Sequence, residues 1–89
     1  MPTLPTTSIH QDENYWYEDG NIVIIANDEV AFRVYRGLLS RVSPLFNDLF
    51  SIGNPSGGEV VYDCPVLRVT DSSHDMRHLL ALLLEPNFM

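Results

Sequence analysis

Two histidines four residues apart, His74 and His78, come closest in this sequence to a known chemical motif. In His-Glu-x-x-His zinc enzymes, two histidines at this spacing share one face of a helix and bind the metal, and the glutamate acts as base. Here the residue after the first histidine is Asp75, a shorter acid, and only eleven residues follow His78 to supply a third ligand. We therefore predict no metal site.

No other stretch of the sequence carries the residues that a catalytic or phosphate-binding site needs. The glycine-rich segment 53–58 is not followed by the lysine of a phosphate-binding loop. Cys64 stands alone before Pro65, and nothing near it in the sequence would activate its thiol, so we expect a buried and inert side chain. The sequence predicts no catalytic residue, no cofactor and no enzymatic activity.

The charge balance restricts the partners that the protein can bind. Its 89 residues include twelve Asp and Glu, five Arg and no Lys, for a net charge of −7. Nucleic acids and anionic membranes attract basic surfaces, so we expect the protein to bind neither. The longest apolar run, residues 79–84, is far too short to span a bilayer. A single cysteine and an N-terminus without a signal-peptide pattern favour an intracellular protein, in the cytoplasm or the nucleus.

The hydrophobic pattern predicts one small α+β domain with the element order β-β-α-α-β-α. Residues 1–13 contain two prolines and few apolar residues, so they indicate a disordered tail, and residues 14–89 form the domain. β-branched runs, serine caps and proline breaks then predict strands at 22–25, 30–36 and 66–70 and helices at 37–42, 44–51 and from Ser72 to Pro86. The second strand alternates, so we expect one of its faces to be exposed.

The same periodicity selects the residues of the core. Apolar residues that recur on one face of each strand or helix should be buried together. These are Ile22, Ile24, Phe32, Val34, Leu39, Phe46, Leu49, Phe50, Leu79, Leu80 and Leu83. We expect alanine at Phe46 or Leu49 to destabilise the fold severely.

Two groups of large apolar side chains are candidates for an interface. The aromatic triplet of residues 15–17 could cover the sheet of its own domain or anchor a partner, because Tyr and Trp dominate interface energetics. The last helix is apolar on more than one side, which predicts an exposed patch near its end. The candidate interface residues are Tyr15, Trp16, Tyr17, Leu82, Leu84 and Phe88.

Several short motifs follow one another in a fixed order between residues 15 and 83. The aromatic triplet precedes Asp19-Gly20-Asn21, the Phe-x-Val-x-Arg-x-x-Leu pattern of residues 32–39, and the Ser-x-x-Phe and Leu-Phe-Ser elements of residues 43–51. In order and spacing, these motifs resemble the opening of fungal BTB/POZ domains. The resemblance covers nearly all of the chain that we expect to be ordered.

The resemblance implies a three-stranded sheet flanked by a cluster of short helices. It also implies dimerisation or partner binding, and in some members recruitment of cullin-family ubiquitin ligases. Ligase adaptors carry an apolar-x-Glu element at the start of the last helix, where this chain has Asp75, Met76 and Arg77, so a cullin ligase is a less favoured partner. Domains of this family continue for at least two more helices, so the resemblance implies a domain that is incomplete at its C-terminus.

Together these observations predict a protein–protein interaction module that forms homo-oligomers or recruits a partner, in the manner of an adaptor. Two alternatives stay open at this point. One is a truncated domain without independent function. The other is a small metal-binding enzyme that uses His74 and His78.

Overall fold

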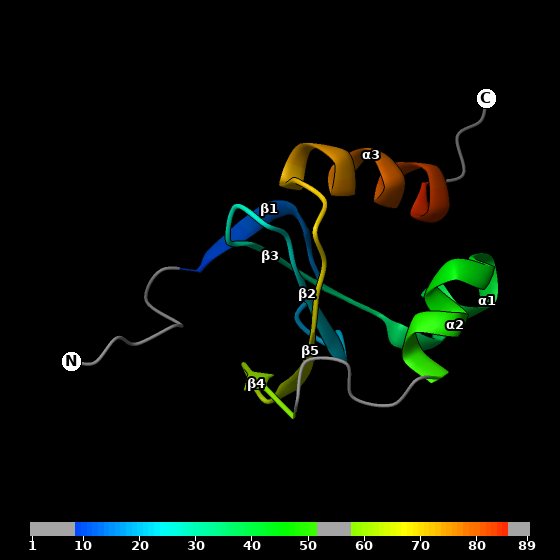
Figure 1. The fold of residues 1–89 in the computed structure, drawn as a ribbon, viewed down its shortest axis with the longest axis horizontal. Helices are drawn as coiled ribbons and strands as arrows, with labels where there is room; N and C mark the ends of the chain where they lie inside the picture. Colours follow the sequence, from blue (N-terminus) through cyan, green and yellow to red (C-terminus); the bar gives the residue numbers. More distant parts are fainter. Residues whose placement is uncertain (1–8, 52–57, 86–89) are drawn as a thin grey trace.

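Five strands and three helices make up the residues that the computed structural model describes, 9–51 and 58–85. In chain order they are β1 (His10–Trp16), β2 (Ile22–Ile25), β3 (Val30–Val34), α1 (Arg36–Val42), α2 (Pro44–Ser51), β4 (Val60–Val61), β5 (Cys64–Arg68) and α3 (Ser73–Leu84), as Figure 1 shows. The protein therefore has the α+β class expected from its sequence.

Strand β2 lies at the centre of a mixed sheet with the order β1-β3-β2-β5-β4. β2 and β3 form the predicted antiparallel pair, in which Ile24 faces Phe32. β5 runs parallel to β2, β1 runs parallel to β3, and β4 is the antiparallel neighbour of β5. All four residues of β2 are buried, as a β-branched run between two neighbouring strands should be.

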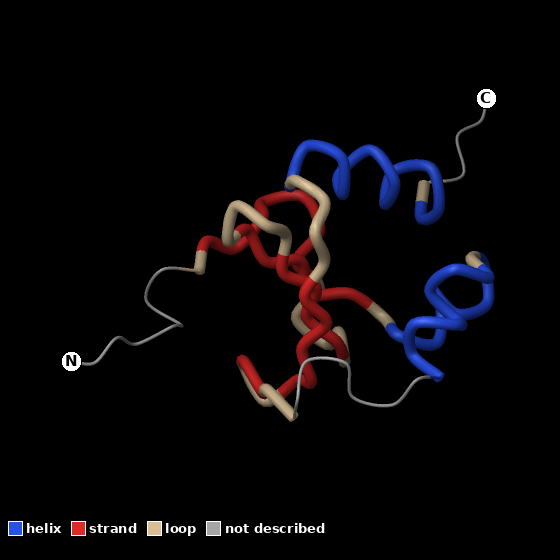
Figure 2. The backbone as a smooth tube through the Cα atoms, viewed as in Figure 1, coloured by secondary structure: helices blue, strands red, loops and turns tan. Residues whose placement is uncertain are grey.

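The two faces of the sheet have different cores. The face toward the helices carries the main core, to which strands and helices both contribute: Ile22, Ile24, Phe32 and Val34 meet Leu39, Phe46, Phe50, Met76 and Leu80. In Figure 2, α3 lies above the strands, and α1 and α2 lie together to their right. The opposite face carries a smaller cluster of Ile9, Val23, Ile25, Ala31, Val61, Cys64 and Val66, with Trp16 packed against it.

The predicted core residues are all found in the main core. Eight of them are buried, namely Ile22, Ile24, Phe32, Val34, Leu39, Phe46, Phe50 and Leu80, whereas Leu49, Leu79 and Leu83 are half-buried at its edge. The two predicted short helices are confirmed as α1 and α2, and the last helix is confirmed as α3. The third predicted strand begins two residues earlier than expected, at Cys64.

The predicted three-stranded sheet is corrected to five strands. Residues 10–13, assigned to the tail from their composition, form the first half of β1 because their backbone pairs with β3. Residues 1–8 lie outside the described residues. The second missed strand, β4, has only two residues. The alternating strand β3 does not expose one face either, because Ala31 is fully buried in the smaller cluster.

Two serines begin helices in the way that the sequence predicts. The hydroxyl of Ser72 accepts a hydrogen bond from the backbone N–H of Asp75, and the hydroxyl of Ser43 accepts one from that of Phe46. Each bond satisfies a backbone N–H that has no partner within the helix. The other end of α2 is held by Arg36, whose guanidinium donates to the carbonyl of Phe50 and lies over its ring.

Strand β1 is fastened to α3 by a buried carboxylate. The register of the β1–β3 pair shifts between Gln11 and Trp16, and Asp12 lies within this irregular stretch. One oxygen of Asp12 accepts hydrogen bonds from the backbone N–H groups of Asn14 and Tyr15, and the other accepts from Nε of Arg77 at 2.6 Å. The charge of Asp12 is thus both paired and hydrogen-bonded, as a buried charge must be.

The turn between β2 and β3 carries a residue in a left-handed conformation. Glu29 has a φ of 66°, and its N–H donates to the carbonyl of Ala26, so it occupies the position where such hairpins favour glycine. A side chain at this φ costs about 1–2 kcal/mol. We therefore expect Glu29→Gly to be about 1 kcal/mol more stable than Glu29→Ala in urea denaturation.

The alanine variant is the matched control for this comparison. Both variants lose the ion pair of Glu29 with Arg68, at 3.6 Å. The difference between their free energies of unfolding therefore measures the cost of a side chain at this left-handed position. If the two variants unfold at the same urea concentration, the left-handed turn stores no strain.

Candidate interaction surface

The aromatic triplet of residues 15–17 is divided between the two faces of the sheet. Successive residues of a strand point to opposite faces. Tyr15 and Tyr17 accordingly belong to the main core, whereas Trp16 packs against the smaller cluster. The triplet therefore does not form one continuous patch.

Tyr15 is a core residue rather than an exposed anchor, since only 5% of it is accessible. Its hydroxyl donates a hydrogen bond to the carboxylate of Glu85, which directly follows α3. Burial, together with this hydrogen bond and the charge of Glu85, raises the pKa of Tyr15 to about 12. The prediction of Tyr15 as an interface residue is therefore wrong, because its side chain is already covered by its own domain.

This environment predicts a loss of stability at alkaline pH. A folded-state pKa above the unfolded value of about 10 gives stability that is complete below pH 10 and is lost as the pH rises toward 12. Tyr15→Phe removes the ionisable group. We expect the melting temperature of the parent to fall more steeply between pH 10 and 12 than that of Tyr15→Phe, as followed by circular dichroism. Parallel curves for the two proteins would contradict the assignment.

The other two aromatic residues pair with neighbours in the same chain. Trp16 meets Tyr62 edge to face, with ring centroids 5.0 Å apart, and Tyr17 stacks on Tyr35 at 4.9 Å. Both members of the triplet are half-buried. Tyr62 and Val60 are both exposed on the β4–β5 hairpin, and Tyr62 meets Trp16 on the side away from the helices.

The patch predicted at the end of the last helix is only partly present. Leu82 is 79% exposed, the largest value among the exposed apolar side chains of the described residues. Leu84 is half-buried and packs against the main core, because it lies on the same side of α3 as Leu80. Phe88 lies outside the described residues.

The two histidines lie side by side on the exposed surface of α3. Their ring centroids are 5.2 Å apart, and the planes are nearly perpendicular. Within residues 9–51 and 58–85, no group of three His, Cys, Asp or Glu side chains is placed to hold a metal ion. Cys64 is buried, as expected, and its thiol donates to the carbonyl of Gly20.

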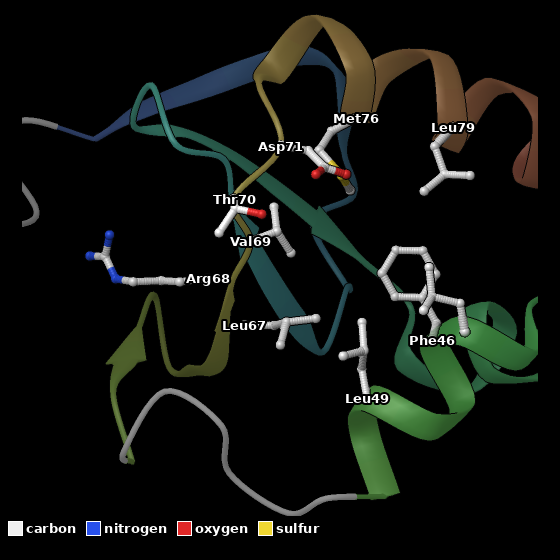
Figure 3. A pocket seen from close by; sticks show the side chains of 10 residues that line it. Phe46, Leu49, Leu67, Arg68, Val69, Thr70, Asp71, Met76 and Leu79 are labelled. Atoms are coloured by element: carbon white, nitrogen blue, oxygen red, sulfur yellow. The ribbon is translucent and has the colours of Figure 1, made fainter.

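An apolar groove of about 280 Å³ opens between α2 and α3. Leu45, Phe46 and Leu49 line it from α2, and Met76 and Leu79 line it from α3. In Figure 3 the side chains of Met76 and Leu79 extend from α3 toward those of Phe46 and Leu49. A concave apolar surface between helices is where side chains of a partner are commonly bound.

The floor and one end of the groove come from β5 and the residues that follow it. Leu67 and Val69 contribute apolar side chains, and Thr70 and Asp71 make the end polar. Arg68 also lines the groove, but in Figure 3 its guanidinium points away from the apolar side chains, and it binds the carboxylate of Glu59 through two hydrogen bonds of 2.9 Å. The groove is therefore apolar along its length, and its polar end is acidic.

Exposed leucines extend the apolar surface on both sides of the groove. Leu45 is 58% exposed at the start of α2. Leu79 and Leu82 are three residues apart in α3, which places them ~60° apart around the helix axis. Leu82 therefore extends outward from the groove on the α3 side.

Of the residues that line this groove, Phe46, Leu49 and Leu79 were predicted as core residues, without a distinction between buried and partly exposed positions. The signal was present in the breadth of the apolar face of residues 45–50, which is wider than one contact requires. The groove itself depends on the distance between α2 and α3, and a local sequence pattern does not predict that distance.

Comparisons with protein-family models, with curated proteins and with solved structures gave no significant match to this chain. Among the helices of the described segments, none is long and apolar enough to cross a membrane.

Proposed function

We propose that this protein is a non-catalytic protein–protein interaction module of the BTB/POZ type, which recruits a partner or a second copy of itself. The single observation that carries the proposal is the apolar groove between α2 and α3, with exposed Leu45 and Leu82 on its two sides. Exposed apolar side chains around a concave surface are typical of binding sites. The resemblance of residues 15–83 to BTB/POZ domains supports the same function.

The ionisable side chains of the described residues support a binding role rather than catalysis. The side chains with the strongest contacts stabilise the fold. Asp12 binds Arg77, Tyr15 binds Glu85, and Asp28 accepts hydrogen bonds from the backbone and hydroxyl of Ser73. A catalytic site would instead bring activated groups together in a cleft. A location in the cytoplasm or nucleus, and cullin ligases as less favoured partners, belong to the same proposal.

The experiment measures association of the full chain and its dependence on the groove. Leu45→Glu and Leu82→Glu place a charge at the two sides of the groove, and both positions are exposed enough to accept it without unfolding. Val60→Glu, at an exposed apolar position on the β4–β5 hairpin, is the matched control. Self-association is measured by light scattering on a sizing column, and partner binding by crosslinking of the tagged chain in cells.

We expect association, with itself or with another protein, that survives Val60→Glu and is lost in Leu45→Glu and Leu82→Glu. The proposal is overturned if the parent is monomeric at high concentration and no crosslinked protein depends on Leu45 or Leu82. Circular dichroism of each variant shows that the fold is retained.

A further inference from the structure

We infer that the groove between α2 and α3 binds a basic amphipathic helix of a different protein. The apolar residues of this helix enter the groove, and its Lys or Arg residues face Asp48, Asp71 and Asp75. This inference rests on the proposed function and specifies the chemistry of the partner.

Two exposed carboxylates, Asp48 on α2 and Asp75 on α3, lie next to leucines that line the groove. On α2, Asp48 follows Leu45 by three residues, so it lies ~60° farther around the helix, away from the buried Phe46. On α3, Asp75 precedes Leu79 by four residues, which places it ~40° farther from the core than Leu79. Both carboxylates are exposed beside a leucine that lines the groove.

Asp71 completes this arrangement at the polar end of the groove, which it lines directly. Within residues 9–51 and 58–85, none of Asp48, Asp71 and Asp75 forms an ion pair, since the arginine pairs involve Asp12, Glu29 and Glu59 instead. Three unpaired negative charges around an apolar groove favour a partner with cationic residues beside its apolar ones.

The same charges argue against a second copy of this chain as the occupant. Each copy carries a net charge of −7 and would bring the same carboxylates to the contact. Like charges brought together at an interface are repulsive, and this protein has no lysine to offset them. The groove thus favours a different protein over self-association.

The shape of the groove favours a helical segment. Its apolar lining comes from two helices and from β5. A partner helix presents apolar side chains at i, i+4 and i+7 along one face, which suits an apolar groove between helices.

The test uses the full chain and three labelled helical peptides of about three turns. All three carry leucines at i, i+4 and i+7, and the flanking residues are lysine and arginine in the first, glutamine in the second and glutamate in the third. Fluorescence anisotropy measures Kd at low and at physiological salt. We expect the basic peptide to bind about tenfold more tightly than the glutamine peptide, with the difference shrinking as salt increases.

Matched variants separate the groove from the overall charge. Asp48→Asn with Asp75→Asn should weaken binding of the basic peptide about fivefold and leave the glutamine peptide within about twofold. Glu13→Gln with Asp63→Asn removes two exposed carboxylates elsewhere and serves as the control. Its affinity for the basic peptide should stay near that of the parent.

Three results would overturn the inference. In the first, the glutamate peptide binds as tightly as the basic one. In the second, the control pair weakens binding as much as the groove pair does. In the third, no peptide binds although association of the chain depends on Leu45 and Leu82. That result would support the interaction module but contradict a basic helix as its partner. If Leu45→Glu affects no association at all, the proposed function fails as well.

Discussion

Replacing Phe46 by alanine is expected to lower the free energy of unfolding by about 3–5 kcal/mol. Phe46 is only 1% exposed in the main core, and its ring stacks on that of Phe50 with centroids 5.8 Å apart. The substitution removes a fully buried ring of α2 from the main core and leaves a cavity. A domain of this size has a total stability of roughly 4–13 kcal/mol, so a large share of the protein should unfold.

Urea denaturation of Phe46→Ala beside two variants of the same helix gives the comparison. Leu45→Ala is the control, because its side chain is mostly exposed, and it should cost less than about 1 kcal/mol. Leu49 is half-buried in the groove, so the severe effect expected for Leu49→Ala from sequence is revised to an intermediate one. Equal midpoints for Phe46→Ala and Leu45→Ala would show that α2 does not pack as described.

Removing the buried carboxylate in Asp12→Ala is expected to cost about 3 kcal/mol. The substitution leaves the backbone N–H groups of Asn14 and Tyr15 without their acceptor, and it leaves Arg77 without its partner. Arg77 is partly exposed and can turn toward water, which keeps the cost below that of stranding a fully buried charge. The measurement is the denaturation midpoint at neutral pH.

Asp12→Asn distinguishes the hydrogen bonds from the charge. Asparagine keeps a side-chain oxygen for the backbone N–H groups but has no charge for Arg77, so an intermediate loss is expected. Arg77→Gln should lower the stability by about as much as Asp12→Asn does if the ion pair makes the larger contribution. An Asp12→Ala variant as stable as the parent would mean that β1 is not fastened to α3.

The helices could be predicted from sequence because their ends are set by neighbouring residues. Ser43 and Pro44 separate α1 from α2, and Ser72 caps α3 through the N–H of Asp75. Strand β2 could be predicted equally well, since four consecutive β-branched residues strongly favour a strand. In each case the pattern and the interactions that stabilise it lie within a few residues.

The strands at the two edges of the sheet could not be predicted in this way. β1 is mostly polar, and it is ordered by pairing with β3 and by the contact of Asp12 with Arg77, far along the chain. β4 has two residues and depends on its hairpin with β5. Neither strand has the length or the alternation that indicates a strand in isolation.

The candidate site was only partly predictable for a related reason. Leu82 was expected to be exposed and is, because a helix that is apolar on several sides cannot bury all of them. Tyr15 was a candidate anchor and is buried, since its environment is supplied by Glu85 at the far end of the described chain. The groove results from the distance between two helices, which follows from the packing of the whole sheet.

The contacts of β1 with α3 also bear on how the protein is synthesised. Asp12 and Arg77 are separated by 65 positions, and Tyr15 and Glu85 by 70. During translation β1 emerges well before α3, so its side-chain contacts with α3 form only after the later helix has emerged. The hairpin of β2 and β3 can form early, but a nascent chain cannot complete its fold until α3 has been released. Until then the groove does not exist, so a partner can bind there only after α3 has emerged.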